Sequence, residues 1–224
     1  YKNLMIKQAI IPLARLGTRL LPLTSVMPKE LLPINGKPNL EYILEECLEA
    51  GVRQFIFIIS KEKIRLKKYF FNDSFYKKII KKKKDQRIIQ EFRKIKKYQK
   101  MIKFVYQNKP KGTGDAVLKC KKFIKNKFFL MLLPDDLIIK KNCTKEMIKL
   151  HNKTKGSIIA TKRVDKKTVS RWGILSIKNK NKNYFQIKDV IEKPSIKKAP
   201  SNYAIIGRYI LPKNIFDEIK KLKP

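Results

Sequence analysis

A glycine, a threonine and two basic side chains follow an apolar segment near the start of the chain. In the stretch ARLGTRLLPLTSVMPKELLP (residues 14–33), Gly17, Thr18 and Arg19 are adjacent, and Lys29 comes ten residues after the arginine. Backbone N–H groups of a glycine-containing loop can approach phosphate oxygens closely, and arginine offers a fork of donors suited to phosphate. These residue types favour a polyphosphate site. An ordinary loop is the alternative, because neither G-x-x-x-x-G-K-[ST] nor G-x-G-x-x-G is present.

Acidic residues end two later apolar segments. Asp135 and Asp136 follow FFLMLLP, where a carboxylate could hold Mg²⁺ between itself and substrate phosphates. A turn or a helix cap is the alternative role of these aspartates. Glu192 and Lys193 come before Pro194, where one could accept hydrogen bonds from sugar hydroxyls and the other could bind phosphate. An exposed ion pair of little energetic weight is the alternative for them.

The elements that must position these residues alternate between strands and helices. The short apolar runs IKQAIIPL, QFIFIIS, KFVYQ and FFLMLLPDD read as strands. Between the first two, apolar residues recur at helical spacing from Leu40 to Leu48, with Asn39 able to cap the start. The pattern predicts a doubly wound, mostly parallel α/β sheet of the Rossmann type, with helices on both faces. Ligands bind at the carboxyl ends of such strands, where Gly17 and Asp135 both fall.

The rest of the chain predicts an insert and a second, strand-rich half. Residues 77–103 are rich in lysine, and Ile88, Phe92 and Ile95 share one helical face, which predicts an amphipathic helix packed on the domain edge. Membrane-surface or RNA binding is the alternative for this insert. Beyond it, SIIATKRV, WGILSIK, YFQIKDVIEKP and YAIIGRYIL predict strands that extend the sheet, followed by a helix at 215–222. A length of 224 residues suits one domain.

Composition limits the partners of the chain. The formal net charge is +37, but the excess is nearly all lysine and is spread over the whole sequence, as AT-rich codon drift would produce. No nucleic-acid partner is therefore expected, although a basic nucleic-acid-binding protein is the alternative from another class. There is no long apolar window and no secretory signal, which predicts a cytoplasmic protein without a membrane partner. Cys47, Cys120 and Cys143 are far apart and predict reduced, mostly buried thiols.

Taken together, these stretches resemble a known family. LARLGTRLLPLTSVMPKELLPINGKP is similar to the signature of the sugar-1-phosphate nucleotidylyltransferases. YILEECLEAGV, NDSFYKK, YQNKPKGTGDAV, LLPDD, VIEKP and APSNYAIIGRY narrow the resemblance to the bacterial UTP:glucose-1-phosphate uridylyltransferases. The resemblance runs from about Lys7 to Ile219, which is nearly the whole chain.

The resemblance implies a reaction and a set of site residues. The reaction is uridylyl transfer from UTP to α-D-glucose 1-phosphate with Mg²⁺, and a relative that uses dTTP or another sugar phosphate is the alternative within the class. The implied halves are a nucleotide-binding part at about 7–140 and a sugar-phosphate-binding part at about 141–224. The implied residues are Arg19 and Lys29 for the triphosphate, Ala14, Gly17, Thr18, Gln107 and Gly112 for the nucleotide, Asp135 for Mg²⁺, and Gly173, Glu192 and Lys193 for glucose 1-phosphate.

Two residues depart from the family pattern. Arg15 stands where the family has a glycine, inside the loop that should lie against the nucleotide, and Ser25 stands where it has a lysine. If φ were positive at Arg15, a side chain there would add strain of about 1 kcal/mol or more. The family also continues beyond residue 224 with a segment that completes the sugar side and helps to form a homo-oligomer. An inactive remnant of the enzyme is therefore a further alternative.

Overall fold

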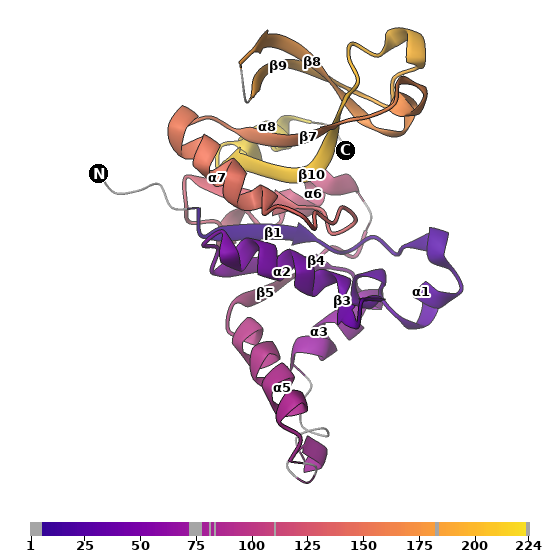
Figure 1. Ribbon diagram of the computed structural model, residues 1–224, viewed down its shortest axis with the longest axis vertical. Helices are drawn as coiled ribbons and strands as arrows, with labels where there is room; N and C mark the ends of the chain where they lie inside the picture. The colour runs from indigo at the N-terminus through magenta and orange to yellow at the C-terminus, as the bar shows by residue number, and fades with distance from the viewer. Residues whose placement is uncertain are drawn as a thin grey trace.

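The computed structural model describes residues 6–71, 78–80, 82, 84–109, 111–181 and 184–222. An eight-stranded sheet forms its centre, in the order β5-β4-β1-β6-β10-β8-β9, with β7 pairing with β10 (Figure 1). A separate two-stranded sheet joins β2 (Pro33–Ile34) to β3 (Lys37–Pro38). The bounds of the eight central strands are β1 Gln8–Pro12, β4 Gln54–Ile59, β5 Ile102–Tyr106, β6 Phe128–Leu132, β7 Ile158–Arg163, β8 Gly173–Lys180, β9 Phe185–Glu192 and β10 Tyr203–Pro212.

Four of these strands form the predicted parallel part of the sheet. β1 pairs in parallel with β4 and β6, and β4 pairs in parallel with β5. The sequences of β1, β4 and β6 are mostly apolar on both faces because each face is covered, whereas β5 at the edge of the sheet is only partly buried. In β1, Ala9 and Ile11 pack into one core cluster and Ile10 into another, all fully buried.

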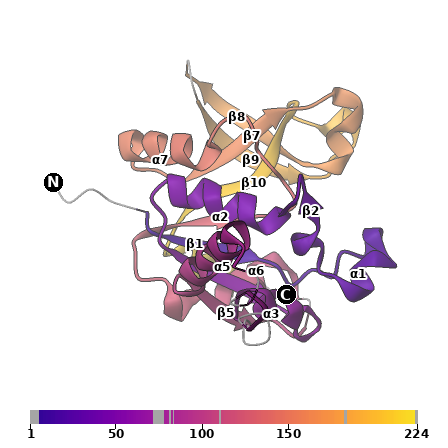
Figure 2. The same cartoon turned by 60° about the horizontal axis from the view of Figure 1, so that its bottom comes forward.

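Helices cover both faces of the sheet, as the sequence predicted. On one face, α2 (Asn39–Glu49) and α7 (Cys143–Thr154) contribute to the core cluster that contains Ala9, together with α3 (Ile64–Phe71) and α5 (Gln86–Gln99). On the other face, α6 (Gly112–Leu118) and α8 (Ile215–Lys221) pack over Ile10. Figure 2 shows the short helix α1 (Leu23–Val26) projecting from the body of the domain. The doubly wound architecture is thus confirmed.

The lysine-rich insert contains the predicted amphipathic helix. The side chain of Asp85 caps α5 by accepting hydrogen bonds from the backbone N–H groups of Arg87 and Ile88. Lys94 forms ion pairs with Glu41 (2.7 Å) and Glu45 (2.9 Å) of α2, and so ties the helix to the domain. The predicted apolar face of Ile88, Phe92 and Ile95 is half-buried. Positions 77, 81 and 83 of the insert lie outside the described residues.

The second half of the chain joins the same sheet through antiparallel strands. β10 pairs antiparallel with β6, β7 and β8, and β8 pairs antiparallel with β9. β10 therefore lies inside the sheet, next to a strand of the first half. Figure 1 shows the β8–β9 hairpin at the end of the molecule opposite α5.

Two local expectations need correction. Asn39 is the first residue of α2 rather than its cap, and its side-chain amide donates to the carbonyl oxygen of Pro134 at 3.1 Å. The sequence reading also missed α7. A signal for it was present, because Asn142 caps this helix by accepting from the backbone N–H of Lys145 at 2.8 Å.

The three cysteines are free, as predicted. Cys47 and Cys120 are buried and Cys143 is half-buried. Burial raises the pKa of Cys120 to about 12 and the pKa of Cys143 to about 11, so these thiols stay protonated at neutral pH. Among the helices of the described residues, none has the length and apolar character needed to cross a membrane.

Candidate functional site

A cavity of about 570 Å³ opens at the carboxyl ends of β1, β4, β5 and β6. It lies at the edge of the sheet where the sequence predicted a ligand site. Segments that follow these strands line it, together with the start of α6 and the end of β9. Six of the predicted site residues lie on its wall: Ala14, Lys29, Gln107, Gly112, Asp135 and Glu192.

The basic and acidic residues with the strongest predicted roles meet in this cavity. The Nζ atom of Lys29 forms an ion pair with Oδ1 of Asp135. The Lys29 side chain is 16% exposed and that of Asp135 is 50% exposed, so both charges remain accessible to a ligand. In the cavity these two charges neutralise each other. Phosphate groups of a ligand could replace Asp135 as the partner of Lys29.

Gly17 lies against the aliphatic part of the Lys29 side chain. Its φ is +76°, in the left-handed region that favours glycine, and a Cβ at this position would lie 3.1 Å from Cδ of Lys29. Thr24 donates a hydrogen bond to the carbonyl oxygen of Gly17 at 3.0 Å. Glycine is therefore required here both by the backbone angle and by the lysine stem.

Thr18 and Arg19, the two residues that follow Gly17, are not part of the cavity wall. Thr18 and Arg19 form a 3₁₀ turn, Thr18–Leu20, and both are exposed. Thr18 lines a smaller hollow of about 280 Å³ beside α1. The structure thus brings Lys29 and Asp135 together in the larger cavity, whereas Arg19 lies in an exposed turn outside its wall.

A buried ion pair holds the segment that carries Lys29. Nζ of Lys63 lies 2.6 Å from both carboxylate oxygens of Glu30, and the two side chains are 4% and 1% exposed. Burial raises the pKa of Glu30 and lowers the pKa of Lys63, and each charge partly offsets the effect of burial on the other. The pair fixes the turn Lys29–Leu31 to the turn Lys61–Lys63 that follows β4.

Gln107 is held in one orientation at the other side of the cavity. Its Nε2 donates to the carbonyl oxygen of Gly112 at 3.1 Å and to Oδ2 of Asp115 at 2.7 Å. Both partners are acceptors, so the amide nitrogen must face them. Gly112 has a φ of +89° at the start of α6. The two residues predicted to read the base are thus hydrogen-bonded to each other.

The three residues predicted for glucose 1-phosphate also lie together. Gly173 begins β8 and pairs with Glu192 at the end of β9. A Cβ on Gly173 would lie 3.1 Å from Oε2 of Glu192, so the glycine leaves room for that carboxylate. Lys193 follows with its Nζ 3.7 Å from Oε1 of Glu192, and both side chains are exposed.

Arg15 is accommodated without the strain that a positive φ would impose. It lines the cavity and is exposed. Among the described residues, positive φ values at positions other than glycine occur only at Asn35, Lys84, Lys155 and Lys193. The departure from the family glycine therefore changes the shape of the cavity rather than the geometry of the backbone.

Comparison with known proteins gives the family. The family described as nucleotidyl transferase matches residues 10–224. The chain belongs to this family. The UTP–glucose-1-phosphate uridylyltransferase 1 of Staphylococcus saprophyticus is 36% identical over 217 residues, which are 96% of this chain and 75% of that protein. The UTP–glucose-1-phosphate uridylyltransferase of Staphylococcus haemolyticus is 35% identical over 219 residues, covering 97% and 76%.

A solved structure agrees with these relatives. UDP-glucose pyrophosphorylase complexed with UDP-glucose matches this nucleotidyl transferase with a TM-score of 0.84 at 35% identity, and the match covers 98% of this chain and 81% of that one. The resemblance and the fold that the sequence predicted are both confirmed.

The carboxylates of this nucleotidyl transferase fit a cation that is shared with a substrate. Among the described residues, no group of three or more His, Cys, Asp or Glu side chains could hold a metal ion by itself. Mg²⁺ is usually bound by one or two carboxylates and substrate phosphates, and the exposed carboxylate of Asp135 fits this mode of binding. Asp136 differs, because its Oδ2 accepts a hydrogen bond from the backbone N–H of Gly207 at 3.1 Å.

Two buried ion pairs that hold the segments around the site of this nucleotidyl transferase were not predicted from the sequence. The pair of Glu30 and Lys63 and the buried pair of Glu46 and Arg208 join segments far apart in the chain. Charged residues are rarely fully buried, so a buried pair stands out in a structure. A sequence does not show which of its charged residues are buried. The sequence alone carried no signal for either pair.

Proposed function

We propose that the protein transfers the uridylyl group of UTP to α-D-glucose 1-phosphate, forming UDP-glucose and pyrophosphate. A phosphate oxygen of glucose 1-phosphate attacks the α-phosphorus of UTP, and the bond from that phosphorus to the departing pyrophosphate breaks. No covalent enzyme intermediate is needed. The names of the relatives support this reaction. The observation that carries it is the pairing of Lys29 with Asp135 in a cavity that Gln107 and Glu192 also line.

Gln107 is proposed to recognise the base. Because its Nε2 is engaged by Gly112 and Asp115, Oε1 is the atom that a ligand N–H can approach. Uracil and thymine carry an imide N3–H that can donate to this oxygen, whereas N3 of cytosine carries no hydrogen and is itself an acceptor. This contact therefore favours UTP and dTTP together, and choice between the two depends on the space around the base.

Lys29, Asp135 and Arg19 are proposed to act on the triphosphate. When substrate binds, Lys29 exchanges its bond with Asp135 for phosphate oxygens, and the freed carboxylate of Asp135 would be the group that holds Mg²⁺. The cation would supply neutralisation of negative charge on the phosphates. Lys29 donates to the oxygens on which charge grows as pyrophosphate departs, and Arg19 binds pyrophosphate from the exposed turn beside Gly17.

Gly173, Glu192 and Lys193 are proposed to bind glucose 1-phosphate. Glu192 lines the cavity, and its carboxylate accepts hydrogen bonds from sugar hydroxyls. Lys193 binds the sugar phosphate and reduces its repulsion from the triphosphate. In-line positioning of the two substrates then provides much of the acceleration.

Pyrophosphate release tests the proposal. The protein is incubated with Mg²⁺, glucose 1-phosphate and each of UTP, dTTP, CTP, ATP and GTP, and reactions without sugar phosphate give the background of hydrolysis. We expect saturable release that is fastest with UTP and slow with CTP, ATP and GTP. Release with none of the nucleotides, together with nucleic-acid binding that weakens steeply with salt, would favour the nucleic-acid-binding alternative instead.

The assembly and location of the protein stay predictions. The family resemblance predicts a homo-oligomer for a chain that carries the family's C-terminal segment, and the composition predicts a cytoplasmic location. Light scattering of such a chain measures the first, and a single-chain mass in solution would contradict it.

A further inference from the structure

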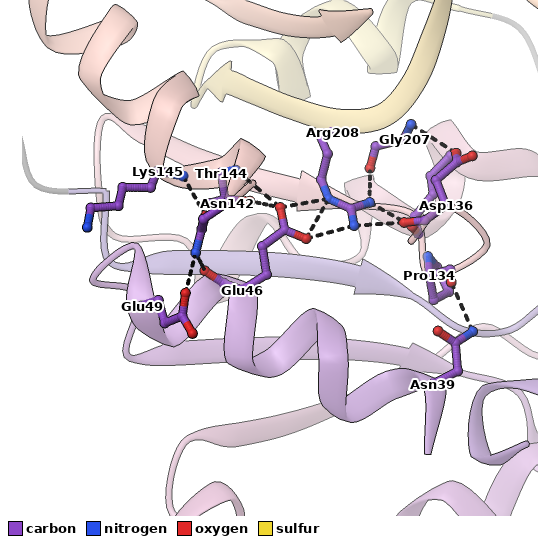
Figure 3. Close-up of polar contacts among 11 residues, drawn as sticks. Asn39, Glu46, Glu49, Pro134, Asp136, Asn142, Thr144, Lys145, Gly207 and Arg208 are labelled. Atoms are coloured by element: carbon purple, nitrogen blue, oxygen red, sulfur yellow. Dashed lines mark hydrogen bonds and ion pairs between the residues drawn. The ribbon is translucent and has the colours of Figure 1, made fainter. Parts of the chain in front are cut away.

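The loop that carries Asp135 is held on both sides of that residue. We call residues Leu133, Pro134, Asp135 and Asp136 the LPDD loop; it follows β6. The contacts that hold its backbone come from β10 and α2 (Figure 3). The backbone N–H of Leu133 donates to the carbonyl oxygen of Gly207 at 2.8 Å, and Asn39 donates to the carbonyl oxygen of Pro134.

Arg208 makes the largest contribution to this support. Its Nη1 donates to the carbonyl oxygen of Leu133 at 3.0 Å, and its Nη2 donates to that of Asp136 at 2.8 Å. The guanidinium thus bonds the residues on either side of Pro134 and Asp135. The side chain of Asp136 is occupied by the N–H of Gly207, so in the LPDD loop the carboxylate that faces the cavity is that of Asp135.

The remaining donors of Arg208 anchor it in the core. Nε and Nη2 donate to the carboxylate of Glu46 at 2.8–3.2 Å, and Nη1 also donates to the carbonyl oxygen of Gly207 at 3.1 Å. All five N–H donors of the arginine are therefore used. Glu46 in turn accepts from the backbone N–H and the hydroxyl of Thr144 at 3.1 and 2.7 Å. These bonds connect α2, α7, β10 and the LPDD loop (Figure 3).

Stability alone does not account for this pair. Arg208 is 0% exposed, and an apolar replacement of a buried ion pair is often neutral or stabilising. Close packing of β10 on the loop is also specific, because a Cβ on Gly207 would lie 2.5 Å from Cβ of Leu133. The backbone of β10 at Gly207 and the guanidinium of Arg208 together form the surface on which the LPDD loop packs.

We propose that Arg208 is a positioning residue for the reaction: it fixes the LPDD loop so that the Asp135 carboxylate stays where it meets Lys29 and the substrate phosphates. This inference rests on the proposed function. Arg208 touches no substrate in it and acts through the backbone of the loop. Because Gln107 and Gly112 belong to other elements, loss of Arg208 should reduce kcat more than it raises the KM for UTP.

The test compares Arg208→Lys with Thr144→Val. Lysine keeps the charge but offers three donors without the planar fork, so it cannot bond Glu46 and both loop carbonyls together. Thr144→Val is the matched control, because it removes a buried hydrogen bond from the same Glu46 carboxylate without touching the loop. Both variants are expected to unfold at lower urea concentration than the wild type.

Two measurements separate positioning from stability. In Arg208→Lys, we expect faster hydrogen exchange in residues 130–136 of the substrate-free protein and a kcat lower by about tenfold or more, since small displacements of catalytic groups have effects of this size. In Thr144→Val, exchange in this segment and kcat should stay at wild-type values. Equal loss of kcat in both variants, or wild-type kcat and exchange in a folded Arg208→Lys, would overturn the proposal.

A second variant covers the case in which Arg208→Lys does not fold. Asn39→Ala removes the bond to the carbonyl oxygen of Pro134 and leaves the buried ion pair intact. It should also speed exchange in residues 130–136 and lower kcat, and faster exchange with a wild-type kcat would overturn the proposal, because a loosened loop would then not impair Asp135. If the wild type releases no pyrophosphate, the proposed function fails, whereas the exchange measurement still decides whether Arg208 orders the loop.

Discussion

Replacing Lys63 by methionine should destabilise the fold strongly, because it leaves the carboxylate of Glu30 buried without its partner. Nζ of Lys63 lies 2.6 Å from both oxygens of Glu30, and the glutamate side chain is 1% exposed. Removal of one partner from a buried pair costs about 3–5 kcal/mol, whereas an exposed pair contributes about 0–1 kcal/mol. Urea denaturation at neutral pH measures the free energy of unfolding of wild type and Lys63→Met.

The pH dependence of this variant gives an independent check. Burial already raises the pKa of Glu30 with the lysine present, and loss of the lysine raises it further. An acid whose folded pKa exceeds its unfolded value contributes less stability as pH rises above the unfolded value. Lys63→Met should therefore recover part of its loss between neutral pH and about pH 5, where the buried carboxyl can be protonated.

A double variant completes a double-mutant cycle for Glu30 and Lys63. Glu30→Leu combined with Lys63→Met removes both buried charges, and its stability should return to near that of the wild type or exceed it. Two results would refute the reasoning. One is a loss below about 1 kcal/mol in Lys63→Met, the value of a surface pair. The other is a double variant as unstable as the single one.

Further predictions concern the site itself. Asp135→Asn should nearly abolish turnover while the unfolding midpoint stays unchanged, and near-normal activity at saturating Mg²⁺ would contradict its role. Arg19→Ala and Lys29→Ala should each lower kcat more than they raise the KM for glucose 1-phosphate, by about 3 kcal/mol in activation free energy for one lost electrostatic contact. A change confined to that KM would exclude the assignment. Arg15→Gly should tighten UTP binding in calorimetric titration, because it removes a side chain from the cavity wall without any strain to relieve. Equal or weaker binding would mean that the arginine contributes to the site.

Local patterns were sufficient to predict the parallel half of the fold. Burial of one or both faces of a strand or helix leaves a periodic pattern of apolar residues in the sequence. This pattern is present in β1, β4, β5, β6 and α2. The same patterns put Gly17 and Asp135 after two strands, and parallel strands bring their carboxyl ends to one edge. The meeting of Lys29 with Asp135 thus agrees with what the sequence indicated.

Long-range contacts were beyond the sequence patterns. Glu46 and Arg208 are 162 positions apart, and no periodicity reports which strand lies next to β6. The insertion of β10 at that position decides where the guanidinium lies. Asn39 was misread for a related reason: its type and place fit a helix cap, but the carbonyl oxygen of Pro134 comes within its reach only in the folded chain.

Isotopic labelling of the sugar phosphate tests the central claim most directly. Glucose 1-phosphate carrying heavy oxygen at the three terminal positions of its phosphate is incubated with UTP and Mg²⁺, and mass spectrometry follows the products. Attack by a phosphate oxygen on the α-phosphorus of UTP keeps every labelled atom in UDP-glucose and none in pyrophosphate. This is the result that uridylyl transfer in the cavity of Lys29 and Asp135 predicts. Asp135→Asn should form almost no labelled UDP-glucose. Label in pyrophosphate, or no UDP-glucose from the wild type, would contradict the account.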